Sequence, residues 1–165
     1  MHSVALIVPL TGEDGPVGTS ISNAARLALL DTGNRSIDLK VYDSTQGGAA
    51  AAAARAISEG NGLLLGPLLA EDVRAAAPIA RRSRVPVIAF SNDESVAGNG
   101  VYILGFTPRQ SIDRVVGFAR SRGAQRFGAL VPTGVYGQRA AQALTDSLRA
   151  TAGTLGAIET FSRPA

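Results

Sequence analysis

The sequence predicts an α/β fold: a three-layer αβα arrangement around a mostly parallel, doubly wound sheet. Short runs of Val, Ile and Leu alternate with longer stretches whose apolar residues recur at helical spacing, which is the pattern of βαβ units. The runs show little polar alternation, so helices are expected on both faces of the sheet. With 165 residues, of which 45% are hydrophobic and 18% charged, the chain is long enough to bury a core.

The elements follow one another in the order that βαβ units require. Strands are expected at residues 4–10, 37–43, 62–65, 86–90, 101–105, 127–131 and 157–161. Helices are expected at 17–31, 47–58, 108–122 and 136–152, the second because alanine is the best helix former. Ile112, Val115 and Val116 should lie on one apolar face of the helix that Pro108 begins. The first five strands are predicted to form one sheet.

Composition and motifs argue against catalysis. The net charge of +3 comes from scattered arginines and there is no tryptophan, so no nucleic-acid partner is expected. The glycines at 12, 15 and 18 are spaced G-x-x-G-x-x-G, which is neither a dinucleotide nor a P-loop motif. The chain has no cysteine and its one histidine, His2, lies near the end of the chain. We therefore expect no cofactor, no metal and no catalytic residue.

Carboxylates also occur near the predicted carboxyl ends of the strands. An acid–base pair could in principle form among Asp43, Glu71, Asp72, Asp93 and Glu94. Glu71 and Asp72 are better explained as first-turn residues of a helix. Asp93 and Glu94 are interpreted as solvated loop charges.

Loops after the strands carry the functional information, because ligands bind open parallel sheets at the carboxyl ends of their strands. These loops, at 11–18, 43–48, 66–72, 91–100 and 132–138, are rich in Gly, Ser, Thr, Asn and Asp. The same residues make turns and helix caps in any protein. Their joint presence at one edge favours a ligand-binding surface.

Three stretches of the chain carry a resemblance to a known family. "VALIVPLTGEDGPVGTSISNAARLALLD", the segment from "LKVYDSTQGG" to "VPVIAFSND", and "RFGALVPTGVYGQ" resemble, in that order, the type I periplasmic binding protein superfamily, which includes Leu/Ile/Val-binding proteins. "GPLLAEDV" followed by "PVIAFSND" is most similar to its penicillin-binding protein activator branch.

The resemblance implies two αβα lobes joined by a hinge, a periplasmic location, and a small polar solute bound in the cleft between the lobes without chemistry. The ligand-binding residues that it implies are Thr11, Gly12, Gly66, Leu68, Leu69, Ser91, Asn92 and Tyr136. The glycines of the first loop would let backbone amides approach the ligand or the opposite lobe. Amino-acid receptors hold the ligand carboxylate with Ser and Thr hydroxyls after the third strand, where this chain has two leucines.

The domain organisation implied is an N-terminal αβα lobe at 1–106 and the beginning of a second lobe at 107–165. Contact with a membrane is expected only through a lipid anchor outside this chain. Two parallel strands in the second part leave both sheet edges unpaired, and apolar residues such as Leu130, Val131, Leu144 and Leu148 need burial. A homodimer with a continuous sheet is one expected solution.

Three functions remain open at this point. The first is a solute receptor of an ABC transporter, for amino acids or another polar solute. The second is a protein-interaction domain that activates a peptidoglycan synthase of the cell wall. The third is the effector-binding core of a LacI-type regulator, which shares the fold but needs an upstream helix-turn-helix.

Overall fold

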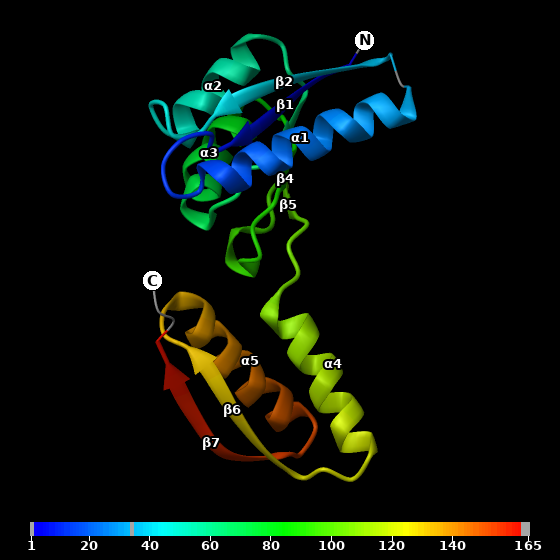
Figure 1. The fold of residues 1–165 in the computed structure, drawn as a ribbon, viewed down its shortest axis with the longest axis vertical. Helices are drawn as coiled ribbons and strands as arrows, with labels where there is room; N and C mark the ends of the chain where they lie inside the picture. Colours follow the sequence, from blue (N-terminus) through cyan, green and yellow to red (C-terminus); the bar gives the residue numbers. More distant parts are fainter. Residues whose placement is uncertain (1, 34, 163–165) are drawn as a thin grey trace. The chain divides into compact units, whose positions relative to one another are not determined.

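The computed structural model describes residues 2–33 and 35–162 and shows two compact units, the first ending at Gly105 and the second beginning at Phe106 (Figure 1). The first unit contains a five-stranded, fully parallel sheet in the order β2-β1-β3-β4-β5. Its elements are β1 His2–Val8, α1 Gly15–Thr32, β2 Ile37–Asp43, α2 Ala49–Ser58, β3 Leu63–Leu65, α3 Ala70–Arg82, β4 Val87–Ala89, the 3-10 turn η1 Glu94–Val96, and β5 Val101–Ile103. The predicted fold class and five-stranded sheet are confirmed.

The strand order places α1 and α2 on opposite faces of the sheet. The chain moves from β1 outward to β2 through α1, then returns past β1 to β3 through α2. Parallel crossovers are right-handed, so this reversal of direction moves the second helix to the other face. The change of direction lies between β1 and β3, and there the loops after these two strands diverge.

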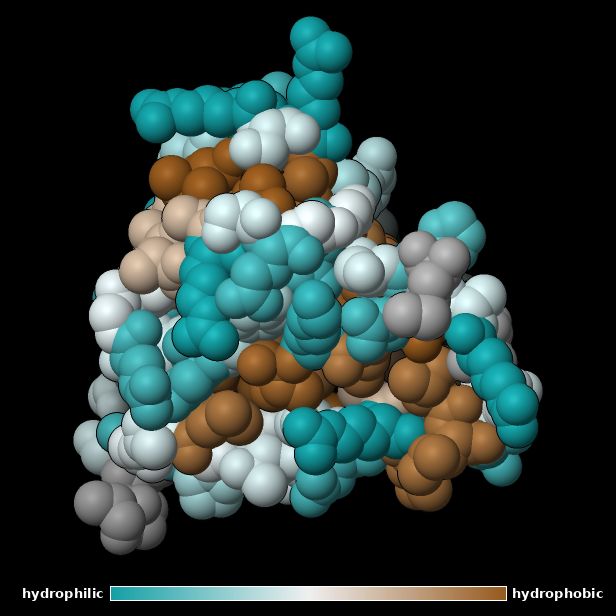
Figure 2. Space-filling model, turned by 90° about the horizontal axis from the view of Figure 1, so that it is seen from above, coloured by the Kyte–Doolittle hydropathy of each residue, from teal (hydrophilic) through white to brown (hydrophobic). Residues whose placement is uncertain are grey.

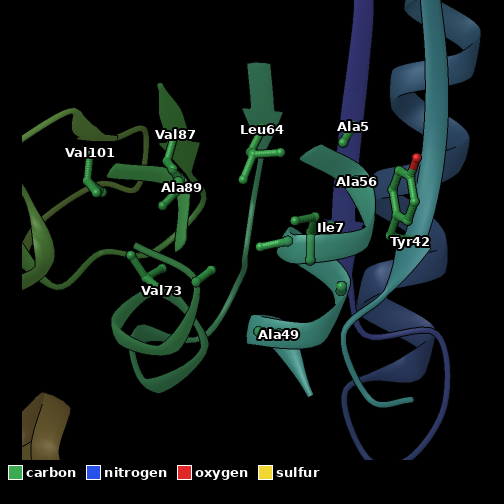
Figure 3. Packing of buried hydrophobic residues seen from close by; sticks show 14 of the residues in the cluster. Ala5, Ile7, Tyr42, Ala49, Ala56, Leu64, Val73, Val87, Ala89 and Val101 are labelled. Carbon is green, nitrogen blue, oxygen red and sulfur yellow. The ribbon is translucent and has the colours of Figure 1, made fainter. Parts of the chain in front are cut away.

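The core of the first unit lies between the sheet and helices α2 and α3. Strand β1 is central, and its residues from Val4 to Val8 are all buried. Ala53 and Ala56 of α2 and Ala76 of α3 are completely buried, because small side chains allow the helices to pack closely on the strands. Figure 3 shows side chains from β1, β3, β4, β5, α2 and α3 meeting in this one cluster.

The opposite face of the sheet is covered less completely. Helix α1 packs on β1 and β2. Farther along the sheet, Tyr102 of β5 is 64% exposed, and so is Leu104 just after it. Leu27 and Leu30 of α1 also face solvent, and apolar areas are visible on the surface in Figure 2. Helices therefore lie on both faces, as predicted, but α1 covers only the β1–β2 part of its face.

The second unit has two parallel strands and two helices. Its elements are α4 Pro108–Ser121, β6 Arg126–Pro132, α5 Val135–Ala150 and β7 Thr154–Phe161. Helices α4 and α5 pack against each other and bury Val116, Leu144 and Leu148. The two leucines therefore need no second chain for their burial, contrary to expectation. Val115, predicted to lie on the buried face of α4, is 65% exposed.

Strand β7 begins three residues earlier than predicted. Its pairing with β6 shifts by one residue after Phe127, which is paired with Leu155, while Gly128 is paired with Ala157. This irregularity breaks the alternation that marks a strand in the sequence.

Among the described residues, none of the helices has the length and apolarity needed to cross a membrane.

Candidate ligand-binding edge of the first unit

The loop after β1 is shaped by close packing of α1 on the end of the strand. Gly12 has a φ of +75° and open space around it. Gly18 is different, because a Cβ atom there would lie 1.7 Å from the carbonyl oxygen of Pro9. Gly18 therefore has a packing reason of its own, because its missing side chain lets the first turn of α1 rest on the end of the strand.

The second unit repeats this arrangement. Strand β6 ends in Val131-Pro132, Gly134 follows with a φ of +101°, and a Cβ atom on Gly137 would lie 1.7 Å from the carbonyl oxygen of Pro132. The shared sequence signal is Val-Pro, then Thr-Gly, then a glycine in the first turn of the helix. Sequence reasoning missed this repeat, although the signal was present at residues 8–18 and 131–137.

Asp43, the last residue of β2, joins the first two loops. Its Oδ1 atom accepts hydrogen bonds from the amide of Leu10 at 3.0 Å, the amide of Thr45 at 2.9 Å and the hydroxyl of Thr45 at 2.6 Å. Thr11 Oγ1 lies 2.6 Å from Thr45 Oγ1 and donates to it, because the Thr45 proton is already used. The exposed Thr11 oxygen therefore keeps lone pairs for a donor on a ligand.

The environment of Asp43 favours its charged form. Burial alone would raise the pKa of this carboxyl, but the hydrogen bonds from the Thr45 hydroxyl and from the amides of Thr45 and Leu10 lower the pKa overall. Asp43 was noted from the sequence only as a possible acid–base group, and Thr45 was not selected. The structure gives both of them the role of positioning Thr11.

The loop after β3 is apolar where it meets α3. Gly66 is buried with a φ of +90°, and a Cβ atom there would lie 2.0 Å from the carbonyl oxygen of Ile7. Leu68 is half-buried, and Leu69 is the N-cap residue of α3 but provides no side-chain cap. Of these three predicted site residues, Gly66 is required by its contact with β1, and the two leucines place apolar surface at the edge.

The start of α3 is acidic. Glu71 and Asp72 lie in its first turn. Burial raises the pKa of Asp72, the Ser44 hydroxyl opposes that effect, and the charges of Glu71 and Asp14 raise the pKa further. Ser44 itself is only 3% exposed. The negative potential of these carboxylates disfavours the binding of a ligand carboxylate at this end of α3.

The loop after β4 is held by an ion pair whose carboxylate is buried and whose guanidinium is half exposed. Asp93 is 2% exposed, and its Oδ2 accepts from the Arg74 guanidinium at 2.7 Å. Its Oδ1 accepts from the amide of Ser95 at 3.0 Å and from its hydroxyl at 2.7 Å. The interpretation of Asp93 as a solvated loop charge is therefore wrong. The signal that could have identified it is the Asp-x-Ser pattern at the start of η1, a side-chain cap.

Ser91 and Asn92 have different environments. Ser91 is buried, and its hydroxyl accepts a hydrogen bond from the Asp93 amide at 3.1 Å, so it stabilises the loop. Asn92 is exposed. Tyr136 belongs to the second unit, where it is the second residue of α5 and 50% exposed.

The polar side chains at this edge are hydroxyls, an amide and carboxylates. Within the described residues, His, Asp and Glu side chains form no group of three that could hold a metal ion. Of the predicted site residues in the first unit, the exposed ones with polar side chains are Thr11 and Asn92, and the loops of this edge also include the leucines after β3 and the acidic start of α3.

A family model described as periplasmic binding protein matches residues 2–163. The chain belongs to this family. The predicted resemblance to type I periplasmic binding proteins is therefore confirmed.

Three relatives illustrate the range of the family. The penicillin-binding protein activator LpoA of Photobacterium profundum is 26% identical over 165 residues, which cover 98% of this chain and 27% of the relative. Full-length LpoA from Haemophilus influenzae matches with a TM-score of 0.80 and 24% identity over 98% of this chain and 30% of its own. The leucine binding protein LivK from Thermotoga maritima matches with a TM-score of 0.70 and 22% identity over 100% of this chain and 50% of its own.

This chain matches only a part of each relative, so the function of a whole relative does not carry over to it directly. The chain spans well under half of the length of the curated relatives that it matches. The structural likeness shows the fold, and the named relatives are binding or activator proteins rather than enzymes.

Proposed function

We propose that this chain is a noncatalytic, periplasmic ligand-binding module, the first lobe and the beginning of the second lobe of a solute-receptor-like protein. The observation that carries the proposal is the edge of the first unit, where Asp43 and Thr45 orient the Thr11 hydroxyl and the buried Asp93 holds the loop that exposes Asn92. Polar groups that several loops bring together at the carboxyl ends of parallel strands are typical of ligand sites in open α/β sheets.

The chemistry of the edge favours a particular class of solute. Thr11 Oγ1 is available as a hydrogen-bond acceptor, and the carboxylates of Glu71 and Asp72 lie in the first turn of α3. We therefore propose a small polar solute that donates hydrogen bonds through hydroxyl or ammonium groups, and not a simple carboxylate. Gly12, Leu68 and Leu69 would contribute backbone and apolar surface, and Tyr136 stays a candidate contact of the second unit.

An NMR titration tests this proposal. Ethanolamine, leucine and benzoate are added separately to the 15N-labelled chain. Because the edge is exposed to solvent, we expect ethanolamine to shift the amide signals of Thr11, Thr45 and Asn92 with a Kd of about 1 mM or weaker, a binding free energy near −4 kcal/mol. Benzoate should leave them unchanged. The variant Thr11→Val, which keeps the shape but removes the hydroxyl, should lose the response to ethanolamine.

The contrary result is equally specific. If benzoate shifts these amides more than ethanolamine does, the assigned ligand polarity is wrong. If none of the three solutes shifts them at concentrations well above 1 mM, the edge is not a small-solute site of this kind.

A second function is favoured by Leu68 and Leu69 together with the similarity to LpoA, which is named a penicillin-binding protein activator. In this alternative the apolar edge contacts a peptidoglycan synthase. Saturable binding to a purified synthase, lost in Leu68→Lys and unchanged in Thr11→Val, would support it. Such binding, together with the absence of an NMR response to the three solutes, would favour this alternative over the first proposal.

A further inference from the structure

The tripeptide Gly-Asn-Gly occurs twice in the chain, each time just before a strand of the first unit. Residues 60–62 precede β3, and residues 98–100 precede β5. An asparagine followed by glycine is chemically labile, because glycine has no side chain to hinder attack by its own amide nitrogen on the asparagine side chain. The tripeptide is the same in both places, so a difference in reactivity between the two asparagines has to come from the fold.

The second copy forms a tight turn at the surface. Gly98 and Val101 exchange backbone hydrogen bonds, at 2.8 Å from the Gly98 amide and at 3.0 Å from the Val101 amide. Between them Asn99 has a φ of +51° and Gly100 a φ of +89°, as in a type I′ turn, where Asn-Gly is a favoured pair. The turn therefore gives a conformational reason for this dipeptide, and the reactivity comes with it.

The groups that would react at Asn99 are not held by the fold. Asn99 is exposed, and within the described part of the chain its side chain makes no hydrogen bond. The amide of Gly100 likewise donates to no acceptor among the described residues. The attacking nitrogen and the side-chain carbonyl carbon therefore belong to adjacent residues that can rotate without breaking a hydrogen bond of their own.

The corresponding groups at Asn61 are fixed on both sides. Asn61 is only 2% exposed, and its Nδ2 donates to the carbonyl of Ala56 at 2.7 Å and to the hydroxyl of Tyr42 at 2.9 Å. The amide of Gly62, which would have to attack, donates to the carbonyl of Ser3 at 2.9 Å. Reaction at Asn61 therefore requires a local opening that breaks all three hydrogen bonds.

We propose that Asn99 is a site of spontaneous deamidation and that the fold protects Asn61 from the same reaction. The Gly100 nitrogen loses its proton and forms a bond to Cγ of Asn99, while the bond from Cγ to Nδ2 breaks and ammonia leaves. Water then opens the resulting five-membered succinimide ring at either carbonyl carbon, which gives aspartate or isoaspartate. In sum, one amide and one water become one carboxylate and one ammonium ion, without oxidation or reduction.

The aspartate product would place a negative charge next to arginines. Asn99 lines a hollow of about 220 Å³ together with Arg74 and Arg81 of α3. Arg74 already pairs with Asp93 at 2.7 Å, whereas Arg81 forms no ion pair with the described residues. Deamidation therefore offers Arg81 a nearby carboxylate, and it lowers the net charge of the chain by one unit from +3.

Peptide mapping by mass spectrometry tests the proposal on the full chain. The native chain and the chain unfolded in concentrated urea are kept in the same warm, mildly alkaline buffer, sampled over time and digested with trypsin. Asn61 then lies in the peptide 56–74 and Asn99 in the peptide 85–109, where fragment ions distinguish it from Asn92. Deamidation is detected as the mass increase that replacement of NH₂ by OH produces, and Asn99→Asp provides the chromatographic reference for the aspartate product.

Comparison of the two samples separates the effect of the sequence from that of the fold. In urea, Asn61 and Asn99 should react at similar rates, because only the shared tripeptide then matters. In the native chain, Asn99 should react at least about tenfold faster than Asn61, which reacts only from locally opened states. Native rates that are equal or in the reverse order would overturn the proposal. An Asn99 that stays intact in the native chain while it reacts in urea, or that reacts in neither sample, would overturn it as well.

Discussion

Two glycine-to-alanine substitutions in helices should have opposite effects on stability. In Gly18→Ala the new methyl group meets the carbonyl oxygen of Pro9 at 1.7 Å. In Gly117→Ala, inside α4, the new methyl group has no neighbour within 4 Å. The chemical change is the same in both variants, so the difference between them measures the close packing of α1 on the end of β1.

The expected magnitudes follow from these distances. Ordinary contact begins near 3.4 Å, so α1 must move by well over 1 Å to admit the methyl group on Gly18. Overpacking of this kind costs about 1–3 kcal/mol, and the upper part of that range applies because the opposing atom belongs to the backbone and cannot change rotamer. Replacing a helical glycine with alanine gains about 0.5–1 kcal/mol. Gly18→Ala should therefore lose about 2 kcal/mol, and Gly117→Ala should gain about 0.5–1 kcal/mol.

Hydrogen exchange measured by mass spectrometry suits a chain with two compact units, because it reports the opening free energy of each one. We expect faster exchange of the β1 amides in Gly18→Ala and slower exchange of the β6 amides in Gly117→Ala. Gly137→Ala, with its methyl group 1.7 Å from the Pro132 oxygen, should speed exchange in β6.

The refuting result is clear. If Gly18→Ala and Gly137→Ala are as stable as the unaltered chain, the helices do not rest on the strand ends in solution, and the glycines have another purpose.

Two further predictions concern the carboxylates of the edge. Arg74→Ala should lower the free energy of unfolding, measured by urea unfolding, by about 1–3 kcal/mol, because it removes the charged hydrogen bond from the guanidinium to the buried carboxylate of Asp93. The exposed pair formed by Arg109 and Asp113 at 3.6 Å provides the control: Arg109→Ala should change the free energy of unfolding by less than about 0.5 kcal/mol. Since the folded-state pKa of Asp43 is lowered, the stability that its charge contributes is present above the unfolded pKa of about 3.9 and is lost as the pH falls through the folded value. The stability difference between the unaltered chain and Asp43→Asn should therefore shrink below about pH 4, and a difference that grows in acid would contradict the assignment.

The sequence predicted the fold well because the elements of the core have strong local signals. The alanine-rich stretch forms α2 at Ala49–Ser58, and the strand Ile37–Asp43 has the predicted bounds. Where β7 is irregular, the boundary moved by three residues. Val115 was placed on the buried face of α4 from its spacing alone, but the second unit provides too little sheet to cover that side.

The candidate edge was predicted less completely, because its organisation depends on contacts between distant residues. Asp43 and Leu10 are 33 positions apart, and Arg74 and Asp93 are 19 apart. The Asp-x-Ser pattern indicates that Asp93 caps η1 but not that it pairs with Arg74, and no local pattern shows that Thr45 orients Thr11. Reasoning from the family selected Ser91 and Gly66, which turn out to be buried, whereas the exposed Thr11 and Asn92 agree with a ligand-contacting role.

The first turn of α3 is the main reason for proposing a solute other than leucine. A helix N-terminus attracts negative charge, and in amino-acid receptors of this family hydroxyls at this place hold the ligand carboxylate. Here Glu71 and Asp72 already place two negative charges in the first turn, and burial raises the pKa of Asp72. A ligand carboxylate would meet like charge at the helix end that should attract it. The proposed function therefore assigns this edge the opposite preference, for a polar solute other than leucine.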